Sequence, residues 1–208
     1  MDVNDATGMS PVDAAALVQQ ARNRARHELT INRPVIFVSW ALCYLLGYGA
    51  VWLSVRGERP YEGPAGWALA LLVLLAIAAL AVTAQVTDRA TRGVEGLSTV
   101  QRRIYWLSLA AGWLGVIVME GALRHQGASQ GMIGVFTAAS PLLVAGVVLV
   151  AVTAAWLNWY LFALGVWLIG VAGFSSFAGP EGVWGIDALA VGLPFLVMGG
   201  LVMIRDRR

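Results

Sequence analysis

The chain has 208 residues, of which 59% are hydrophobic and 12% are charged, and its formal net charge is +2. A soluble domain has about 45–50% apolar and about 25% charged residues. The composition therefore excludes a soluble enzyme, a nucleic-acid-binding protein and a disordered chain. It predicts an all-α polytopic membrane protein whose partner is the lipid bilayer.

Missing residue types exclude several kinds of chemistry. The chain has no lysine, and all 14 basic residues are arginine, which excludes a retinal Schiff base, a pyridoxal site and a P-loop. The two histidines, His27 and His125, lie outside the apolar runs and cannot hold a haem between membrane helices. The single cysteine, Cys43, excludes a disulfide framework. We expect no cofactor, no metal site and no enzymatic activity.

The first 33 residues are polar and form the predicted cytoplasmic N-terminal segment, 1–33. A helix start at Ser10-Pro11 is followed by apolar residues at helical spacing, with Arg22, Arg24 and Arg26 beside them. This pattern predicts an amphipathic helix on the cytoplasmic leaflet, with its arginines facing anionic headgroups. A solvated helix that leads into the first span is the alternative.

Six apolar runs follow, each 20–22 residues long, close to the ~20 residues that cross a bilayer as a helix. The predicted spans are Val35–Val55, Trp67–Val86, Ile104–Leu123, Met132–Thr153, Leu157–Phe177 and Trp184–Ile204. They define a six-helix transmembrane bundle over 34–204 and a short cytoplasmic tail, 205–208. If residues 154–156 do not turn, the fourth and fifth runs fuse and five spans remain.

The distribution of arginine predicts the orientation. With the N-terminus inside, eleven arginines lie on the cytoplasmic side and three outside, which follows the positive-inside rule. The eleven are Arg22, Arg24, Arg26, Arg33, Arg89, Arg92, Arg102, Arg103, Arg205, Arg207 and Arg208. Arginine without lysine indicates a GC-rich bacterial genome, so we expect the bacterial cytoplasmic membrane, with both termini cytoplasmic. Trp184 falls at a predicted span end, which is typical of interfacial tryptophan.

Two acidic residues lie within the predicted spans. Glu120 and Asp187 are each three residues inside the outer end of their run, and an ionisable residue in a membrane is a functional-site hypothesis. If the third and sixth spans touch, the two carboxylates form an acidic vestibule for a cation or a proton. The alternative is that Glu120 pairs with Arg124 at i,i+4 and that Asp187 reaches water.

Two prolines interrupt predicted spans near their midpoints. Pro141 frees the carbonyl of Thr137, and Pro194 frees that of Ala190. Broken membrane helices expose carbonyls that transporters use to bind substrates or ions, and the hydroxyls of Thr137 and Ser140 would add to such a site. A structural kink is the alternative.

The predicted cytoplasmic loop Thr87–Arg103 is rich in arginine. It contains Arg89, Arg92, Arg102 and Arg103. Either it docks a soluble partner, such as an ATPase or a regulator, or it is only the orientation signal that such a loop carries. Association of the chain with itself into a homo-oligomer is also open.

The stretch from Arg22 to Leu53, RNRARHELTINRPVIFVSWALCYLLGYGAVWL, resembles six-span membrane proteins of actinobacteria that are generically labelled transporters. The overall plan is also similar to the permease subunit of an ABC-2-type exporter. These resemblances imply a transport-related function, as a small permease or the membrane subunit of an exporter. The alternative is a non-catalytic membrane scaffold or sensor that binds a cytoplasmic partner through residues 10–33 and 87–103.

Overall fold

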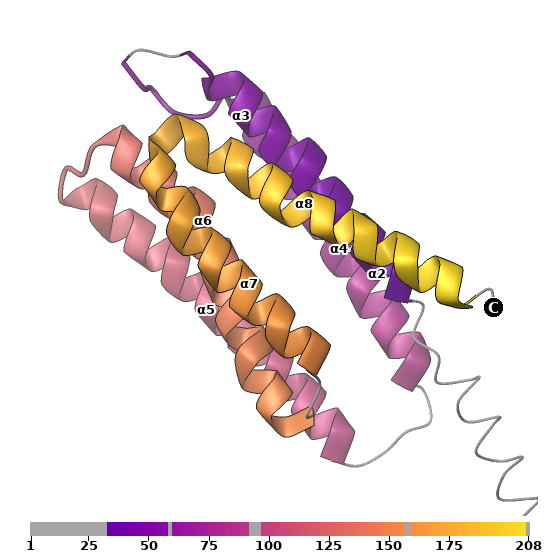
Figure 1. Ribbon diagram of the computed structural model, residues 1–208. Helices are drawn as coiled ribbons and strands as arrows, with labels where there is room; N and C mark the ends of the chain where they lie inside the picture. Colours follow the sequence, from indigo (N-terminus) through magenta and orange to yellow (C-terminus); the bar gives the residue numbers. More distant parts are fainter. Residues whose placement is uncertain (1–32, 58–59, 92–96, 157–158, 207–208) are drawn as a thin grey trace, which may run out of the picture.

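The computed structural model describes residues 33–57, 60–91, 97–156 and 159–206 (Figure 1). All secondary structure in this part of the chain is helical. The predicted amphipathic helix with Arg22, Arg24 and Arg26 lies outside the described residues, as does Arg92.

The first apolar run forms one helix in three parts, because its middle turn is a π-helix. Five further long helices follow, and a short 3₁₀ turn joins the last two. The elements are α2 (Arg33–Leu42), the π-helix η2 (Cys43–Tyr48), α3 (Gly49–Val55), α4 (Gly66–Thr91), α5 (Leu97–His125), α6 (Gln130–Trp156), α7 (Trp159–Ser175), the 3₁₀ turn η3 (Ser176–Ala178) and α8 (Gly179–Asp206).

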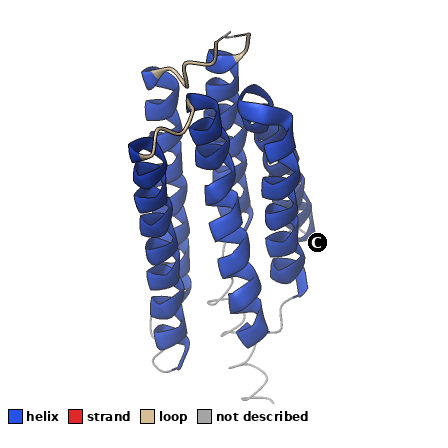
Figure 2. Ribbon diagram, turned by 90° about the vertical axis from the view of Figure 1, so that its left-hand side faces the viewer, coloured by secondary structure: helices blue, strands red, loops and turns tan. Residues whose placement is uncertain are grey.

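Five stretches are long and apolar enough to cross a membrane. The last of them, Trp159–Ile204, contains both α7 and α8. Each of the six predicted runs therefore coincides with a helix. Figure 2 shows the helices aligned along a common direction, with the described loops gathered at one end.

Helices extend beyond the predicted spans at two places. Most of the predicted loop Thr87–Arg103 is helical, because α4 continues to Thr91 and α5 begins at Leu97. Polar side chains end the apolar run, but they do not end the helix, since the backbone hydrogen bonds continue. Helix α8 starts at Gly179, five residues before the predicted span. Its start is set by Gly179, whose φ is 74°, and by the proline that follows, a residue favoured in a first helical turn.

Glycines at seven-residue spacing bring α8 against the first helix in an antiparallel arrangement. A Cβ atom added at Gly185 would lie 2.9 Å from Nε1 of Trp52, and one at Gly192 would lie 2.6 Å from Cγ of Leu45. One at Gly199 would lie 3.1 Å from Cγ2 of Val38. Seven residues are close to two helical turns, so the three glycines form one continuous contact stripe.

The backbones of α6 and α7 approach each other even more closely. A Cβ atom added at Gly146 would lie 2.8 Å from the carbonyl oxygen of Gly165, and the reverse distance is also 2.8 Å. These two helices lie side by side and run in opposite directions (Figure 1). Helix α5 packs on the other side of α6, where Gly112 faces Val144.

Helix α5 is the most exposed of the candidate spans. In the most apolar stretch of its span, 0% of the residues are buried, compared with 39% in the corresponding stretch of the span in α6. Its apolar side chains therefore face outward, as expected for a helix in contact with lipid.

A column of aromatic rings runs through the interface between the first helix and α8. Phe37 and Tyr44 both contact Phe195, with ring centroids 5.8 and 6.1 Å apart. Tyr44 stacks on Tyr48 at 5.1 Å, and Tyr48 contacts Trp184 at 5.3 Å. Large aromatic surfaces thus fill the space that the glycines leave on either side of their contact stripe.

The contact between α6 and α7 gives a first prediction. We expect Gly146→Ala to lower the free energy of unfolding by about 1–3 kcal/mol, because the added methyl group would overlap backbone atoms that cannot move aside. Chemical unfolding in detergent micelles measures this change. Gly170→Ala on α7 is the matched control, since nothing lies within 4 Å of its added Cβ atom. Equal stabilities of the two variants would contradict the close contact.

Candidate functional site

Asp187 lies on the buried side of α8. Its neighbours one turn away on the same side, Val183, Trp184 and Val191, have exposed fractions of 0%, 1% and 0%, and that of Asp187 itself is 0%. Eight residues separate it from the start of the helix at Gly179, which places it about 12 Å along the axis. Asp187 is thus a core residue, and the alternative in which its carboxylate reaches water is wrong.

The Asp187 carboxyl has no hydrogen bond from any described group. Both of its oxygens are buried and without a hydrogen-bond partner within this part of the chain. Ser175, at the end of α7, is close enough to act on the carboxyl. However, its hydroxyl donates to the carbonyl oxygen of Ala172 at 3.5 Å. A buried carboxyl without a partner is costly, so this position calls for an explanation.

Two tyrosines of the π-helix η2 face the same region. Tyr44 and Tyr48 are both buried, and the ring of Tyr48 contacts that of Trp184, one turn before Asp187 on α8, with centroids 5.3 Å apart. Trp184 is also fully buried, and its indole Nε1 has no hydrogen-bond partner among the described residues. Trp184, the residue predicted at a span end, is thus buried among the helices, and α8 begins five residues before it.

No arginine of the described chain neutralises Asp187. These arginines lie at the ends of the candidate spans or outside them. The guanidinium of Arg56 sits 5.1 Å from the ring centroid of Trp52, and Arg124 pairs with Glu120. The negative charge of an ionised Asp187 would therefore be uncompensated by any arginine whose side chain the structure describes.

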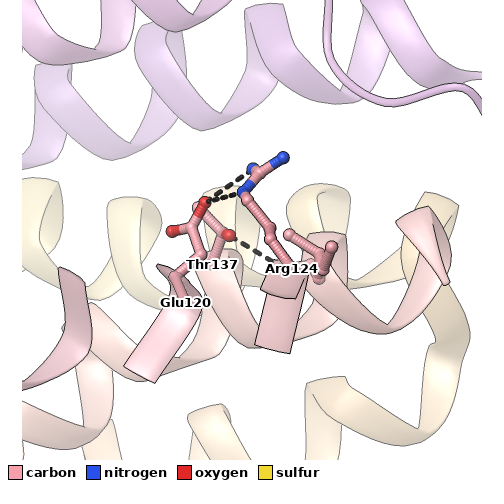
Figure 3. A network of polar contacts seen from close by, with 4 residues as sticks. Glu120, Arg124 and Thr137 are labelled. Carbon is pink, nitrogen blue, oxygen red and sulfur yellow. Dashed lines mark hydrogen bonds and ion pairs between the residues drawn. The ribbon is translucent and has the colours of Figure 1, made fainter. Parts of the chain in front are cut away.

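Glu120 lies in a different environment. Its Oε1 accepts hydrogen bonds from Nη2 and Nε of Arg124 at 2.7 and 3.2 Å, which confirms the predicted i,i+4 pair. Figure 3 shows Thr137, on the neighbouring helix α6, beside this ion pair. The Thr137 hydroxyl donates to the carbonyl of Ile133 at 2.8 Å and so bonds within its own helix.

The structure does not bring Glu120 and Asp187 together into a vestibule. Helix α5, which carries Glu120, packs on α6, and α6 in turn packs on α8. Glu120 lies five residues from the end of α5, about 7.5 Å along its axis.

Aromatic donors from other helices bond to backbone in both proline-broken turns. The Trp167 indole on α7 donates to the carbonyl oxygen of Ala190, which Pro194 frees, at 2.9 Å. The Tyr48 hydroxyl donates to the carbonyl oxygen of Ala138 at 3.2 Å, in the turn that Pro141 interrupts. The carbonyl at Pro194 is therefore already engaged, which favours the structural kink over a ligand site there.

The remaining predicted residues divide into two groups. Ser140 is 8% exposed, and its hydroxyl has no hydrogen-bond partner in the described chain, so it remains a candidate. Of the predicted docking arginines, Arg89 and Arg103 are exposed at helix ends. Arg102 is in α5, but its side chain is outside the described part.

Ser175 and Trp184 were not predicted as site residues. A signal for Trp184 was available, because residues 183, 184, 187, 188 and 191 form one helical stripe in which Asp187 is the only polar member. No comparable sequence pattern points to Ser175. It ends α7, and it lies near Asp187 of α8 because the chain turns between these two helices.

Fold and site together define a helical multi-pass membrane protein with a carboxyl buried among its helices. No protein-family model, no curated protein and no solved structure matches the chain. What can be inferred about its function rests on the residues described above.

The proline-broken turns give a second prediction. We expect Trp167→Phe to lower the free energy of unfolding by about 1–3 kcal/mol, because it leaves the carbonyl that Pro194 frees without a donor. Tyr48→Phe should lower it by about 0.5–1.5 kcal/mol, because it removes a buried hydrogen bond between two helices. Chemical unfolding in micelles measures the loss. Trp113→Phe, at a residue that is 38% exposed on α5, is the control and should change stability little. A control that loses as much as the other two would contradict a specific role of these bonds.

Proposed function

We propose that the chain is a small membrane transport protein, either a permease or the membrane subunit of an exporter, and that Asp187 binds the transported or coupling ion. The observation that carries this proposal is the complete burial of the Asp187 carboxyl with no hydrogen bond to either oxygen within the described chain. Ionisable residues inside membrane helices mark the pathways of ions and substrates.

The energetics of burial support a functional role for Asp187. Leaving a polar group buried without a partner costs about 1–3 kcal/mol, and more for a charged group. An apolar residue of similar size at position 187 would remove this cost. Asp187 therefore lowers the stability of the fold, which is typical of a residue that is present for a function such as ligand exchange.

The proposed topology has six crossings of the bacterial cytoplasmic membrane, with both termini in the cytoplasm. The antiparallel arrangement of α6 and α7 supports the fourth and fifth crossings (Figure 1). With 17 residues, α7 is about 26 Å long, close to the ~30 Å of the hydrocarbon core. The orientation rests on the excess of arginine on the cytoplasmic side.

A membrane scaffold or sensor is the second candidate, and the exposure of α5 favours it. This helix packs on α6 alone among the long helices, so its outer face is open to a partner as well as to lipid. A partner bound there would make Asp187 incidental to function.

Cysteine labelling tests the topology. In a Cys43→Ser background, we expect a cysteine at position 60 to react with a membrane-impermeant maleimide added to intact cells. A cysteine at position 95 should react only after the membrane is permeabilised, because the arginine distribution keeps that loop inside. The reverse pattern would overturn the orientation.

Electrical recording tests the transport function. Proteoliposomes on a solid-supported membrane are perfused in turn with amino acids, sugars, nucleosides and organic amines. We expect the wild type to give a current with at least one of these solutes, and Asp187→Asn to abolish it, because the amide keeps the shape of the side chain and cannot ionise.

Glu120→Gln is the matched control for this recording. It also neutralises an intramembrane carboxylate, but one that is already paired with Arg124. We expect it to keep the current. If the wild type gives no current with any solute, the transport proposal fails and the scaffold becomes the better candidate. If the wild type and Asp187→Asn give the same current, the protein transports but Asp187 does not bind the ion.

A further inference from the structure

The residues around the Asp187 carboxyl limit which kinds of cation can bind to it. The elements packed against α8 are α2, η2, α3, α6, α7 and η3. Within these elements, the π-helix η2 has three titratable groups, Cys43, Tyr44 and Tyr48, all of them buried. Helix α6 has no acidic, basic, histidine, cysteine or tyrosine residue. Arg33 is the first residue of α2 and Tyr160 is the second residue of α7. Both therefore lie at the helix ends that are far from the turn between α7 and α8, whereas Asp187 lies toward that turn.

Arg56 lies just after the end of α3, which packs against α8. The backbone N–H of Gly57, the next residue, donates to Oε2 of Glu181 at 3.4 Å, which places Arg56 beside the first turn of α8. Glu181 and Asp187 are six residues apart, about 9 Å along the helix. The Arg56 guanidinium also stacks on Trp52. It is therefore engaged at the helix end and does not compensate the buried carboxyl.

A metal ion does not fit this environment. Calcium takes about six to eight oxygen ligands, and magnesium takes an octahedral set of about six. The side-chain oxygens near the carboxyl are those of Ser175 and of the two tyrosines of η2, which together with the two carboxyl oxygens are fewer than about six. The described residues contain no group of three His, Cys, Asp or Glu side chains that could hold a metal ion. Val183, Trp184 and Val191 offer no side-chain oxygen.

A larger organic cation does not fit either. Asp187, Val183, Trp184 and Val191 have exposed fractions of 0–1%, and the Trp184 ring lies directly against Tyr48, with centroids 5.3 Å apart. The carboxyl is thus enclosed by packed side chains. The smallest cation, a proton, needs no space and no further ligand.

We propose that the ligand of Asp187 is a proton, so that transport by this protein is coupled to proton movement; this inference rests on the proposed transport function. In the closed arrangement the carboxyl is a neutral acid with the proton on one carboxyl oxygen. When the site opens to water, the O–H bond breaks, the proton passes to a water molecule, and the carboxylate keeps the electron pair. A proton from water on the other side restores the neutral acid before the site closes.

Tyr48 connects this step to the arrangement of the helices. Its hydroxyl donates to the carbonyl of Ala138 and thereby joins η2 to α6. The ring of Tyr48 also contacts that of Trp184, one turn before Asp187 on α8. Asp187 therefore lies close to a bond between two helices at a proline-broken turn, which is a place where a helix can bend.

Infrared spectroscopy of the purified full chain in lipid tests the inference directly. At neutral pH, we expect the wild type to show the carbonyl stretch of a protonated carboxylic acid. This band should be lost in Asp187→Asn and retained in Glu120→Gln. Labelling of aspartate with ¹³C should shift the band, and Asp187→Glu should keep a protonated acid that is insensitive to this label. Size-exclusion chromatography confirms that each variant is folded.

Two infrared results would overturn the proton assignment. One is the absence of the protonated band from the wild type at neutral pH. The other is its replacement by a carboxylate band when sodium, potassium or magnesium is added, which would show that a metal ion displaces the proton.

Recording of currents separates this inference from the transport proposal. A protonated Asp187 in a protein that gives no current with any solute would count against transport alone. A current that requires Asp187 but does not change with the pH gradient across the vesicle would count against proton coupling alone. We expect the current to increase when the gradient drives protons in the direction of the solute.

Discussion

Membrane helices must satisfy their polar groups without water, and this constraint shapes the bundle at both of its prolines. A proline removes one backbone hydrogen bond and leaves a carbonyl exposed to hydrocarbon. Trp167 donates to the carbonyl that Pro194 frees, and Tyr48 donates within the turn that Pro141 interrupts. Each kink is thus bridged by an aromatic side chain of another helix, and the two bonds tie α7 to α8 and η2 to α6.

Such bonds require helices that lie close together, and glycine provides this closeness. The stripe of Gly185, Gly192 and Gly199 lets α8 lie against the first helix, and Gly146 with Gly165 does the same for α6 and α7. Without a hydrophobic effect between helices in lipid, close van der Waals packing is a main source of association. The aromatic column then fills the remaining space and positions Tyr48, whose hydroxyl donates to the carbonyl of Ala138.

Asp187 departs from this pattern of satisfied polar groups, and it is the acidic residue that does so among the described residues. Its oxygens have no partner in the described chain, although its side chain is fully buried. Glu120 shows the contrast, since it is paired with Arg124 on the same helix and lies nearer the helix end. A carboxyl group therefore has a structural role on α5 and a proposed functional role on α8. The difference arises because Glu120 lies beside an arginine, whereas Asp187 is buried without one.

Local properties could be predicted from the sequence because they depend on neighbours along the chain. The length of each apolar run determined where the helices lie, and the i,i+4 spacing determined the pair of Glu120 and Arg124. The seven-residue glycine spacing on α8 was also visible, but its partner was not. Only the tertiary structure decided that Asp187 is buried and unpaired, because the residues around it come from η2, α7 and α8. The same holds for the bond from Trp167 to Ala190, since a donor on another helix leaves no periodic signal in the sequence.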